Sequence, residues 1–259
     1  MNNLRLMYVL AHPDDESLGT GGTLAKYAAE GVETYLVTAT RGERGRFGER
    51  GERPDPEVVG KTREAELLAA AKELGLREVK LLGFPDGALD TVDPAGAQET
   101  IAGHLRRVRP QVVMTFGPEG AYGHPDHIAI SQLTTAAIVR AADREFAVSK
   151  LYYIAWSERT WSAYQAAVKK LTSTVDGVER QVTPSPEWGV TTRIDTSAVW
   201  PSVWRAVQCH RTQMSVYKDL EGLPAEHHRS LWGVQEFYRA FSLVNGGRAR
   251  ESDLFEGLR

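Results

Sequence analysis

The segment that decides the fold lies near the N-terminus, at residues 4–16, LRLMYVLAHPDDE. Residues 4–10 form a short apolar run rich in strand-forming side chains, which predicts a buried β-strand. Residues 11–16 predict a loop, and residues 18–30 predict a helix that Ser17 caps and that ends before Gly31. A buried strand followed by a loop and a helix is the unit from which parallel sheets are built.

The same succession of strand, loop and helix recurs through the first 145 residues. Strands are predicted at residues 33–38, 79–82 and 112–116, and helices at residues 57–74, 93–108 and 126–144. This order predicts an α/β fold, with a doubly wound, mostly parallel sheet that carries helices on both faces.

The C-terminal part of the chain gives weaker signals. Elements are predicted at residues 151–155 (strand), 160–171 (helix), 191–194 (strand) and 197–213 (helix). No repeat or linker divides the chain, so we predict one domain over residues 1–259. Residues 1–145 form its core in this interpretation, and residues 146–259 complete the sheet and the substrate pocket. The choice of substrate is expected to depend on this extension and on a long loop, residues 40–56.

Composition and charge exclude several classes of protein. The formal net charge of −3 does not favour a nucleic-acid-binding protein. The single cysteine, Cys209, can form neither an internal disulfide nor a zinc ribbon. No apolar run is long enough to span a bilayer, and the N-terminus lacks a signal-peptide pattern. We therefore expect a cytoplasmic protein without nucleic-acid or membrane partners.

Two motifs rich in His and Asp follow the first and the fourth predicted strand. They are HPDDE at residues 12–16 and GHPDH at residues 123–127. A doubly wound sheet with strand order 3-2-1-4-5 binds ligands beyond the carboxyl ends of strands one and four, where the strand order reverses. The two motifs are therefore expected to face each other across one crevice.

The residue types in these motifs fit a catalytic metal site. His12, Asp14 and Asp15 lie within four positions, and His124 and His127 can share one face at a helix start. A catalytic site takes about three ligands from His, Asp or Glu and leaves one position open. Two histidines and one aspartate from both motifs would supply them, and a remaining carboxylate can act as a general base. Either motif alone is more often an ordinary loop or helix start, so their combination carries the prediction.

Taken together, AHPDDE at residues 11–16 and GHPDH at residues 123–127 resemble the LmbE-like (PIG-L) family of zinc-dependent de-N-acetylases. The resemblance extends over about residues 4–145 and implies a Rossmann-like fold. It implies Zn²⁺ as the cofactor, with Fe²⁺ or another divalent ion as an alternative. It also implies a small-molecule N-acetylated sugar conjugate as the substrate, since the family typically removes acetyl from N-acetylglucosamine units. A homo-oligomer stays open.

The resemblance also implies roles for individual residues at the metal. It implies His12, Asp15 and His127 as the metal ligands. Asp14 is then the general base that deprotonates the metal-bound water. His124 is expected to stabilise the tetrahedral oxyanion and to protonate the leaving amine.

Further positions match the family around this centre. Asp126 is expected to orient His124, and Tyr122 to contact the oxyanion. Arg63 and Asp86 match substrate-binding positions, although a helix-surface ion pair and a turn are ordinary alternatives for them.

The stretch HRTQ, residues 210–213, is similar to the family's C-terminal His-x-x-Gln stretch. The resemblance suggests that His210 and Gln213 close the pocket, but it assigns them no role.

Three other functions are alternatives to a deacetylase. An amidase of a thiol-sugar conjugate would use the same centre. A non-catalytic sugar- or metal-binding module would have no need for both Asp14 and His124. A nucleotide-binding oxidoreductase is disfavoured, because SLGTGG at residues 17–22 fails the Gly-x-Gly-x-x-Gly spacing.

Overall fold

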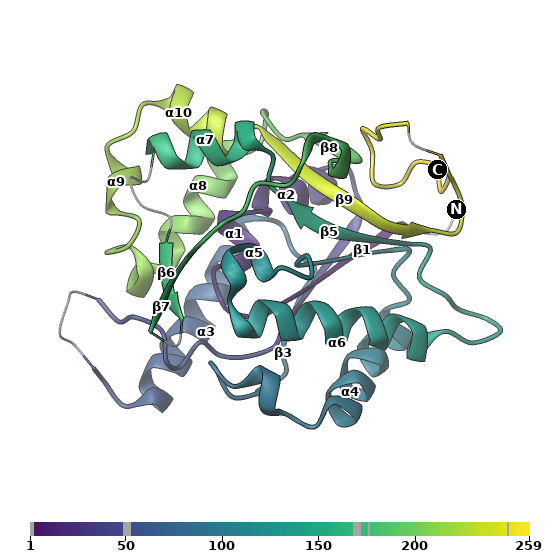
Figure 1. Ribbon diagram of the computed structural model, residues 1–259, viewed down its shortest axis with the longest axis horizontal. Coiled ribbons are helices and arrows are strands. Elements are labelled where there is room, and N and C mark those ends of the chain that lie inside the picture. The colour runs from purple at the N-terminus through teal and green to yellow at the C-terminus, as the bar shows by residue number, and fades with distance from the viewer. Residues whose placement is uncertain (1–2, 49–52, 168–171, 176, 248) are drawn as a thin grey trace.

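A seven-stranded sheet forms the centre of the protein in a computed structural model that describes residues 3–48, 53–167, 172–175, 177–247 and 249–259. Its strands are β1 (Arg5–Leu10), β2 (Glu33–Thr38), β3 (Glu78–Leu81), β4 (Val112–Thr115), β5 (Lys150–Ala155), β8 (Thr192–Asp195) and β9 (Val234–Ser242). They lie in the order β3-β2-β1-β4-β5-β9-β8 (Figure 1). The first five pair in parallel, and β9 pairs antiparallel with both β5 and β8.

The parallel part of the sheet confirms the predicted doubly wound order. Strand β1 lies between β2 and β4, so Leu6 has Thr34 as its register partner on one side and Val112 on the other. All four residues of β4 are buried, as expected for a strand covered on both faces. The order reverses at β1, and this places the carboxyl ends of β1 and β4 side by side.

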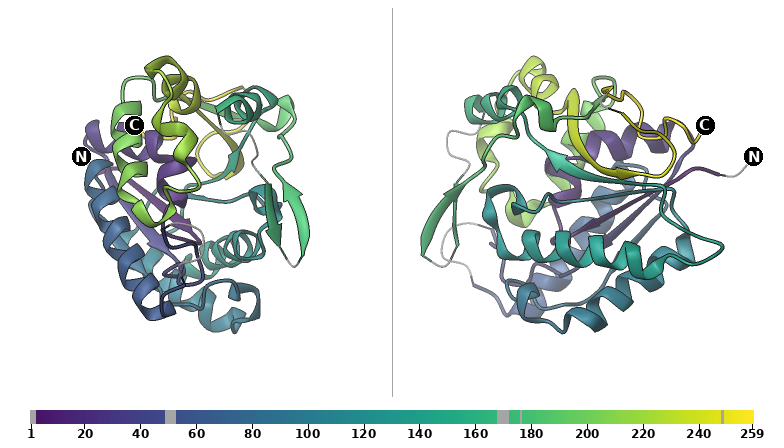
Figure 2. Two further views of the ribbon diagram at one scale, coloured as in Figure 1. Left: turned by 90° about the vertical axis from the view of Figure 1, so that its left-hand side faces the viewer. Right: turned by 45° about the vertical axis from the view of Figure 1, so that its right-hand side comes forward.

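Helices cover both faces of the sheet. The helices α2 (Gly21–Ala29), α3 (Pro56–Glu73) and α8 (Trp200–Cys209) lie on one face, and α4 (Pro94–Val108) and α6 (Pro125–Ala141) lie on the other (Figure 2). The starts of α3 and α4 follow from sequence. Asp55 and Asp93 accept hydrogen bonds from backbone N–H groups of the first turn, and a proline occupies the first turn of each helix.

The first predicted helix is divided in two. The chain turns at Asp14, which has a positive φ of 110°, and α1 (Asp15–Leu18) begins directly after it. The predicted cap at Ser17 is therefore wrong, because Ser17 is buried within this short helix. Helix α2 then starts at Gly21. A Cβ atom at Gly22 would lie 2.8 Å from the Cβ of Thr196, so this close approach requires glycine.

Two more helix boundaries differ from the prediction. The segment between the strand predicted at residues 112–116 and the helix predicted at residues 126–144 contains a short helix, α5 (Gly120–Gly123). Helix α6 begins at Pro125 and ends at Ala141, whereas the prediction continued it to residue 144.

The C-terminal part contains elements that the sequence did not reveal. These are a hairpin of β6 (Thr172–Val175) and β7 (Val178–Gln181), the strand β9, and the helices α9 (Lys218–Glu221) and α10 (Ala225–Trp232). The apolar pattern of β9 is interrupted by Gln235 and Glu236. Both are buried, and their side chains accept hydrogen bonds from Thr23 and Ser157.

The weak signals in this part correspond to real elements with shifted ends. The strand predicted at residues 191–194 is β8. The helix predicted at residues 160–171 is α7 (Glu158–Ala167), and residues 168–171 lie outside the described part of the chain. The helix predicted at residues 197–213 is α8, which ends at Cys209 and is followed by a 3₁₀ turn, Arg211–Gln213.

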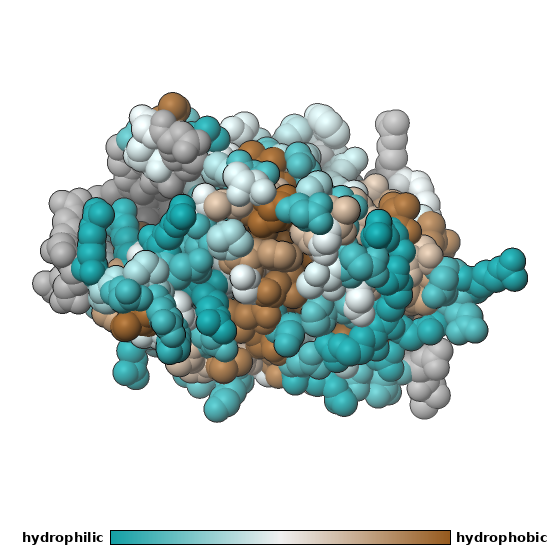
Figure 3. All heavy atoms as spheres, turned by 90° about the horizontal axis from the view of Figure 1, so that it is seen from below, coloured by the Kyte–Doolittle hydropathy of each residue, from teal (hydrophilic) through white to brown (hydrophobic). Residues whose placement is uncertain are grey.

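The apolar core draws on both ends of the chain. The main buried apolar cluster includes Tyr8 of β1 and Phe255 near the C-terminus, so both parts of the chain contribute to it. Seen from below, a hydrophobic band crosses the surface between hydrophilic regions (Figure 3). Among the described residues, no helix combines the length and the apolar character needed to cross a bilayer.

Glu251 fixes the C-terminal segment to the sheet. Its carboxylate accepts hydrogen bonds from Lys150 Nζ at 2.8 Å, Tyr152 Oη at 2.7 Å and Thr192 Oγ1 at 2.8 Å. Lys150 is fully buried. The substitution Glu251→Gln should lower the free energy of unfolding by about 3–5 kcal/mol, because it leaves a buried ammonium without its counter-charge. Urea denaturation measures this change.

An exposed ion pair supplies the control for this prediction. Glu187 pairs with Arg193 and is well exposed, so Glu187→Gln should change the free energy of unfolding by less than about 1 kcal/mol. Burial alone would raise the pKa of Glu251, but its hydrogen bonds lower it from 4.5 to about 2. The wild type should therefore lose this stabilisation as the pH falls from 4.5 toward 2. Equal effects of the two variants would contradict the assignment.

Candidate active site

The ends of β1 and β4 bring the two motifs together. The HPDDE loop follows β1, and the GHPDH motif leads into α6 after β4. Nε2 of His127 lies 3.3 Å from Nδ1 of His12, although 115 positions separate the two residues. The predicted meeting of the motifs at the reversal of strand order is therefore confirmed.

Three side chains offer donor atoms to one point. Besides the contact between the two histidines, Asp15 Oδ1 lies 3.4 Å from His127 Nε2, and Asp15 Oδ2 lies 3.6 Å from His12 Nδ1. Bonds of about 2.0–2.2 Å to a tetrahedral ion would separate its ligand atoms by about 3.3–3.6 Å. The spacing and the chemistry of His12, Asp15 and His127 therefore fit a divalent metal ion.

The environment of His12 is strongly acidic. Its Nε2 lies 3.0 Å from Asp126 Oδ2 and 3.2 Å from Asp86 Oδ1, on the side of the ring opposite the donor atom Nδ1. Burial alone would lower the pKa of His12, but Asp126, Asp15 and Asp86 raise it well above 6.5. This excess of carboxylates attracts a cation. A metal-binding histidine also commonly donates its second N–H to a carboxylate, which fixes the ring.

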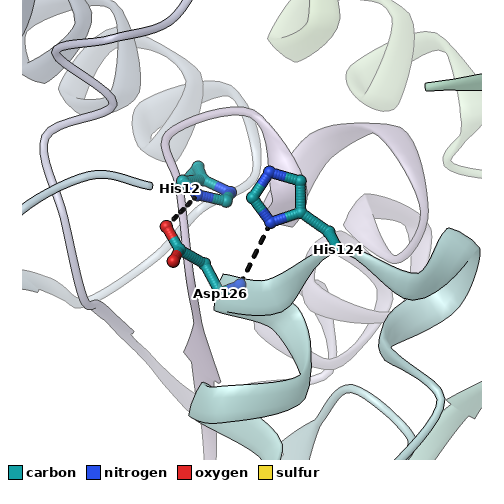
Figure 4. Close-up of side chains that lie close together, drawn as sticks. All are labelled: His12, His124 and Asp126. Atoms are coloured by element: carbon teal, nitrogen blue, oxygen red, sulfur yellow. Dashed lines mark hydrogen bonds and ion pairs between the residues drawn. The ribbon is translucent and has the colours of Figure 1, made fainter. Parts of the chain in front are cut away.

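Asp126 contacts both His12 and His124, and its expected role in orienting His124 stays a prediction. The carboxylate accepts hydrogen bonds from His12 and from the backbone N–H groups of Gly87 at 2.7 Å and Leu89 at 3.0 Å. Burial would raise the pKa of Asp126, but these contacts lower it to about 2. Its backbone N–H instead donates to His124 Nδ1 at 3.2 Å (Figure 4). The start of α6 presents this N–H to the ring, while the side chain turns toward β1.

His124 is a neutral hydrogen-bond donor in this arrangement. Burial, together with the nearby rings of His127 and His12, lowers its pKa from 6.5 to about 4. Because Nδ1 accepts the backbone hydrogen bond, the neutral ring carries its proton on Nε2. The ring therefore can donate a hydrogen bond to a developing negative charge.

His12, Asp15 and His127, whose ligand atoms could hold a metal ion, are called the donor cluster below. Asp14 lies beside this cluster but is not part of it. Its Oδ2 is 3.3 Å from Arg63 Nη2 and 3.5 Å from Tyr217 Oη. Burial raises the pKa of Asp14 to about 6; Arg63 opposes this shift, and Asp15 adds to it. A carboxylate with a pKa near neutrality can both accept and return a proton, as a general base must.

The two expected substrate-binding residues are largely engaged within the protein. Arg63 is 4% exposed, and besides Asp14 its guanidinium contacts the carbonyl oxygens of Pro13 and Gly42. Asp86 is 5% exposed, and its Oδ2 accepts a hydrogen bond from the backbone N–H of Arg44 at 2.8 Å. Both residues hold loops at the site, and their direct contact with substrate stays a prediction.

Tyr122 lies at the site, as predicted. Its ring centre is 5.8 Å from that of His124, edge-on, and 5.4 Å from that of His127. Burial raises its pKa, so the hydroxyl keeps its proton and can donate it in a hydrogen bond. The adjacent Gly123 is held by the β6–β7 hairpin, since Arg180 donates to its carbonyl oxygen.

The C-terminal part adds residues that sequence reasoning missed or left without a role. His210 Nε2 lies 2.7 Å from Glu16 Oε1, and Gln213 Nε2 donates to the carbonyl oxygen of Arg46 in the loop of residues 40–56. Residues 49–52 of that loop lie outside the described part of the chain. Nothing in the sequence pointed to Tyr217, because a lone tyrosine in an irregular segment carries no pattern.

The arrangement around His12 leads to a test at Asp126. The substitution Asp126→Asn should weaken metal binding by about 10–100-fold, because it removes the charge that holds the His12 ring. Titration with a competing chelator measures the affinity. Asp93→Asn is the control, because Asp93 is exposed and asparagine caps a helix equally well. Unchanged affinity in the Asp126 variant would contradict a supporting role.

Comparison with known proteins agrees with this site. The family model described as GlcNAc-PI de-N-acetylase, PIG-L, matches residues 7–138. A Thermobifida fusca protein named 1D-myo-inositol 2-acetamido-2-deoxy-alpha-D-glucopyranoside deacetylase is 37% identical over 296 residues, which cover 98% of this chain and 100% of the relative. A Kineococcus radiotolerans protein of the same name is 34% identical over 98% of this chain and 83% of its own length.

Solved structures show the same fold. A conserved protein of Thermus thermophilus superposes with a TM-score of 0.66 at 29% identity, over 95% of this chain and 99% of the other. The N,N'-diacetylchitobiose deacetylase of Pyrococcus horikoshii superposes with a TM-score of 0.64 at 17% identity, over 91% and 83%. The family match, the full-length relatives and the paired motifs lead to one conclusion: this chain belongs to the PIG-L family of de-N-acetylases and is a deacetylase that hydrolyses amide C–N bonds.

Proposed function

We propose that this deacetylase removes the acetyl group from an N-acetylglucosamine conjugate whose sugar is joined to inositol. The relatives that carry this substrate in their names match nearly the whole chain at 34–37% identity. The observation that carries the chemistry is the position of Asp14, a carboxylate beside three converging donor atoms but outside their set.

His12, Asp15 and His127 are the proposed ligands of the metal, with Zn²⁺ as the ion and Fe²⁺ as the alternative. Both ions accept two imidazoles and a carboxylate. When bound, such an ion lowers the pKa of a coordinated water and polarises the amide carbonyl.

Asp14 takes a proton from the attacking water, in this proposal. The water oxygen forms a bond to the acetamide carbon, and the C–N bond then breaks. The products are acetate and a free amine. Because the pKa of Asp14 is about 6, this carboxyl can pass its proton to the departing nitrogen.

His124 and Tyr122 stabilise the oxyanion of the tetrahedral intermediate by donating hydrogen bonds. Oxyanion contacts of this kind contribute about 3–4 kcal/mol each. The expectation that His124 also protonates the amine requires an imidazolium. Its pKa of about 4 makes the ring neutral at pH 7, so the proposal assigns the proton transfer to Asp14.

A substrate screen tests the function. Purified protein is loaded with Zn²⁺ or Fe²⁺, or treated with a chelator, and is offered N-acetylglucosamine joined to inositol, to other alcohols, or to nothing. A fluorogenic amine reagent follows the release of free amine. We expect the inositol conjugate to react fastest, chelation to abolish the reaction and metal to restore it.

Other outcomes of the screen would contradict the proposal. Equal rates for all conjugates would overturn the inositol assignment. Cleavage of only an acylated thiol-sugar conjugate would favour an amidase with the same centre. Full activity after complete removal of metal would overturn the role of the three ligands.

A further inference from the structure

A buried carboxylate–imidazole pair contacts the backbone of Asp14, the proposed base. Glu16 is fully buried and His210 is 1% exposed, and His210 Nε2 lies 2.7 Å from Glu16 Oε1. The two residues are 194 positions apart, so the pair joins the HPDDE motif to the C-terminal part of the chain. Neither residue belongs to the donor cluster, and the proposed chemistry does not use them.

The second oxygen of Glu16 holds the backbone of Asp14. Glu16 Oε2 accepts a hydrogen bond from the Asp14 N–H at 3.0 Å. Asp14 has a φ of 110°, a backbone conformation that residues with a side chain rarely adopt. Such a conformation persists only where its surroundings hold it. The Glu16 carboxylate therefore binds the strained turn through Oε2, while its Oε1 contacts His210 and accepts a hydrogen bond from the Ser17 hydroxyl at 2.5 Å.

The chain after His210 reaches Asp14 from another side. Thr212 donates from its backbone N–H and its hydroxyl to the two carboxylate oxygens of Glu66 in α3, which anchors the segment. Five residues after Thr212, Tyr217 Oη lies 3.5 Å from Asp14 Oδ2. The C-terminal part thus reaches Asp14 in two ways. His210 acts on the Asp14 backbone through Glu16, and Tyr217 contacts the Asp14 carboxylate directly.

We propose that Glu16 and His210 are positioning residues for the base Asp14. His210 contacts Glu16 Oε1 and holds the carboxylate in the orientation in which Oε2 accepts the hydrogen bond from the Asp14 N–H. This contact maintains the positive-φ turn that places the Asp14 carboxylate beside the donor cluster. The inference rests on the proposed function of Asp14, and it gives a role to the His-x-x-Gln stretch.

Kinetics of Glu16 variants test the proposal. Glu16→Ala should lower kcat by at least 10-fold with KM and metal content near those of wild type, because substrate and metal contacts remain. Glu16→Gln should recover part of kcat, since its amide oxygen can still accept from the Asp14 N–H. His210→Asn should lower kcat in the same way. This variant replaces Glu16→Ala as the test if Glu16→Ala does not fold.

A matched control separates positioning from general support. Glu66 is also a buried carboxylate, 8% exposed, and it anchors the same C-terminal segment without a hydrogen bond to Asp14. Glu66→Ala should lower the thermal stability but keep kcat within about twofold of wild type. In an Asp14→Asn background, Glu16→Ala should cause no further loss of residual turnover, because there is no base left to position.

Hydrogen exchange at the Asp14 amide provides a readout that needs no substrate. Exchange should be at least 10-fold faster in Glu16→Ala than in wild type, and intermediate in Glu16→Gln. A folded, metal-replete Glu16→Ala enzyme with normal kcat and normal exchange would overturn the proposal, as would an equal loss of turnover with and without Asp14. If wild type releases no amine from any conjugate while the exchange results hold, the proposed function fails and the positioning of Asp14 stands.

Discussion

Replacing Asp14 by asparagine should reduce kcat by about 10²–10⁴-fold while the metal content stays near that of wild type. The carboxylate lies outside the donor set, 3.3 Å from Arg63 Nη2, so the three proposed ligands remain intact. Asparagine has nearly the same shape and tolerates a positive φ, and it should preserve the turn after β1. What it cannot do is accept the proton of the attacking water. Initial rates and elemental analysis of the same preparation measure the two quantities.

Asp90→Asn is the matched control for this substitution. Asp90 is exposed in a 3₁₀ turn (Leu89–Thr91) and contacts none of the site residues, so its variant should keep full activity. Full activity of Asp14→Asn would show that another group is the base. Loss of metal from Asp14→Asn would instead place this residue among the ligands.

Replacing His127 by alanine should remove the metal and, with it, the activity. His127 Nε2 lies 3.3 Å from His12 Nδ1 and 3.4 Å from Asp15 Oδ1, so alanine deletes one of three converging donor atoms. The affinity should fall by more than the roughly 100-fold that loss of an outer-shell partner causes. Elemental analysis after dialysis measures the occupancy, and added metal should restore activity only partly.

His227→Ala is the corresponding control, because His227 is exposed on α10. It should retain its metal through the same dialysis. Full occupancy of His127→Ala would show that the ligand set is wrong. Together, His127→Ala and Asp14→Asn distinguish a residue that binds the metal ion from one that acts on the attacking water.

The C-terminal part shows where sequence patterns lose their power. Strand β9 was missed because Gln235 and Glu236 interrupt its apolar alternation, and both are buried by partners elsewhere in the fold. The predicted cap at Ser17 is wrong because the chain turns at Asp14 and α1 begins directly after it, where Glu16 contacts both the Asp14 N–H and His210. In each case a long-range hydrogen bond overrides the local preference.

Sequence alone determined the parallel core and the place of the site. Short apolar runs specify β1 to β5, and the rules of doubly wound sheets then bring HPDDE and GHPDH to one edge. Only the tertiary structure decided which partners the polar side chains take. It joined Asp126 to His12 across 114 positions and Glu16 to His210 across 194. A local pattern encodes which face of a strand or helix is buried, but a buried polar group takes the partner that packing places within hydrogen-bond reach.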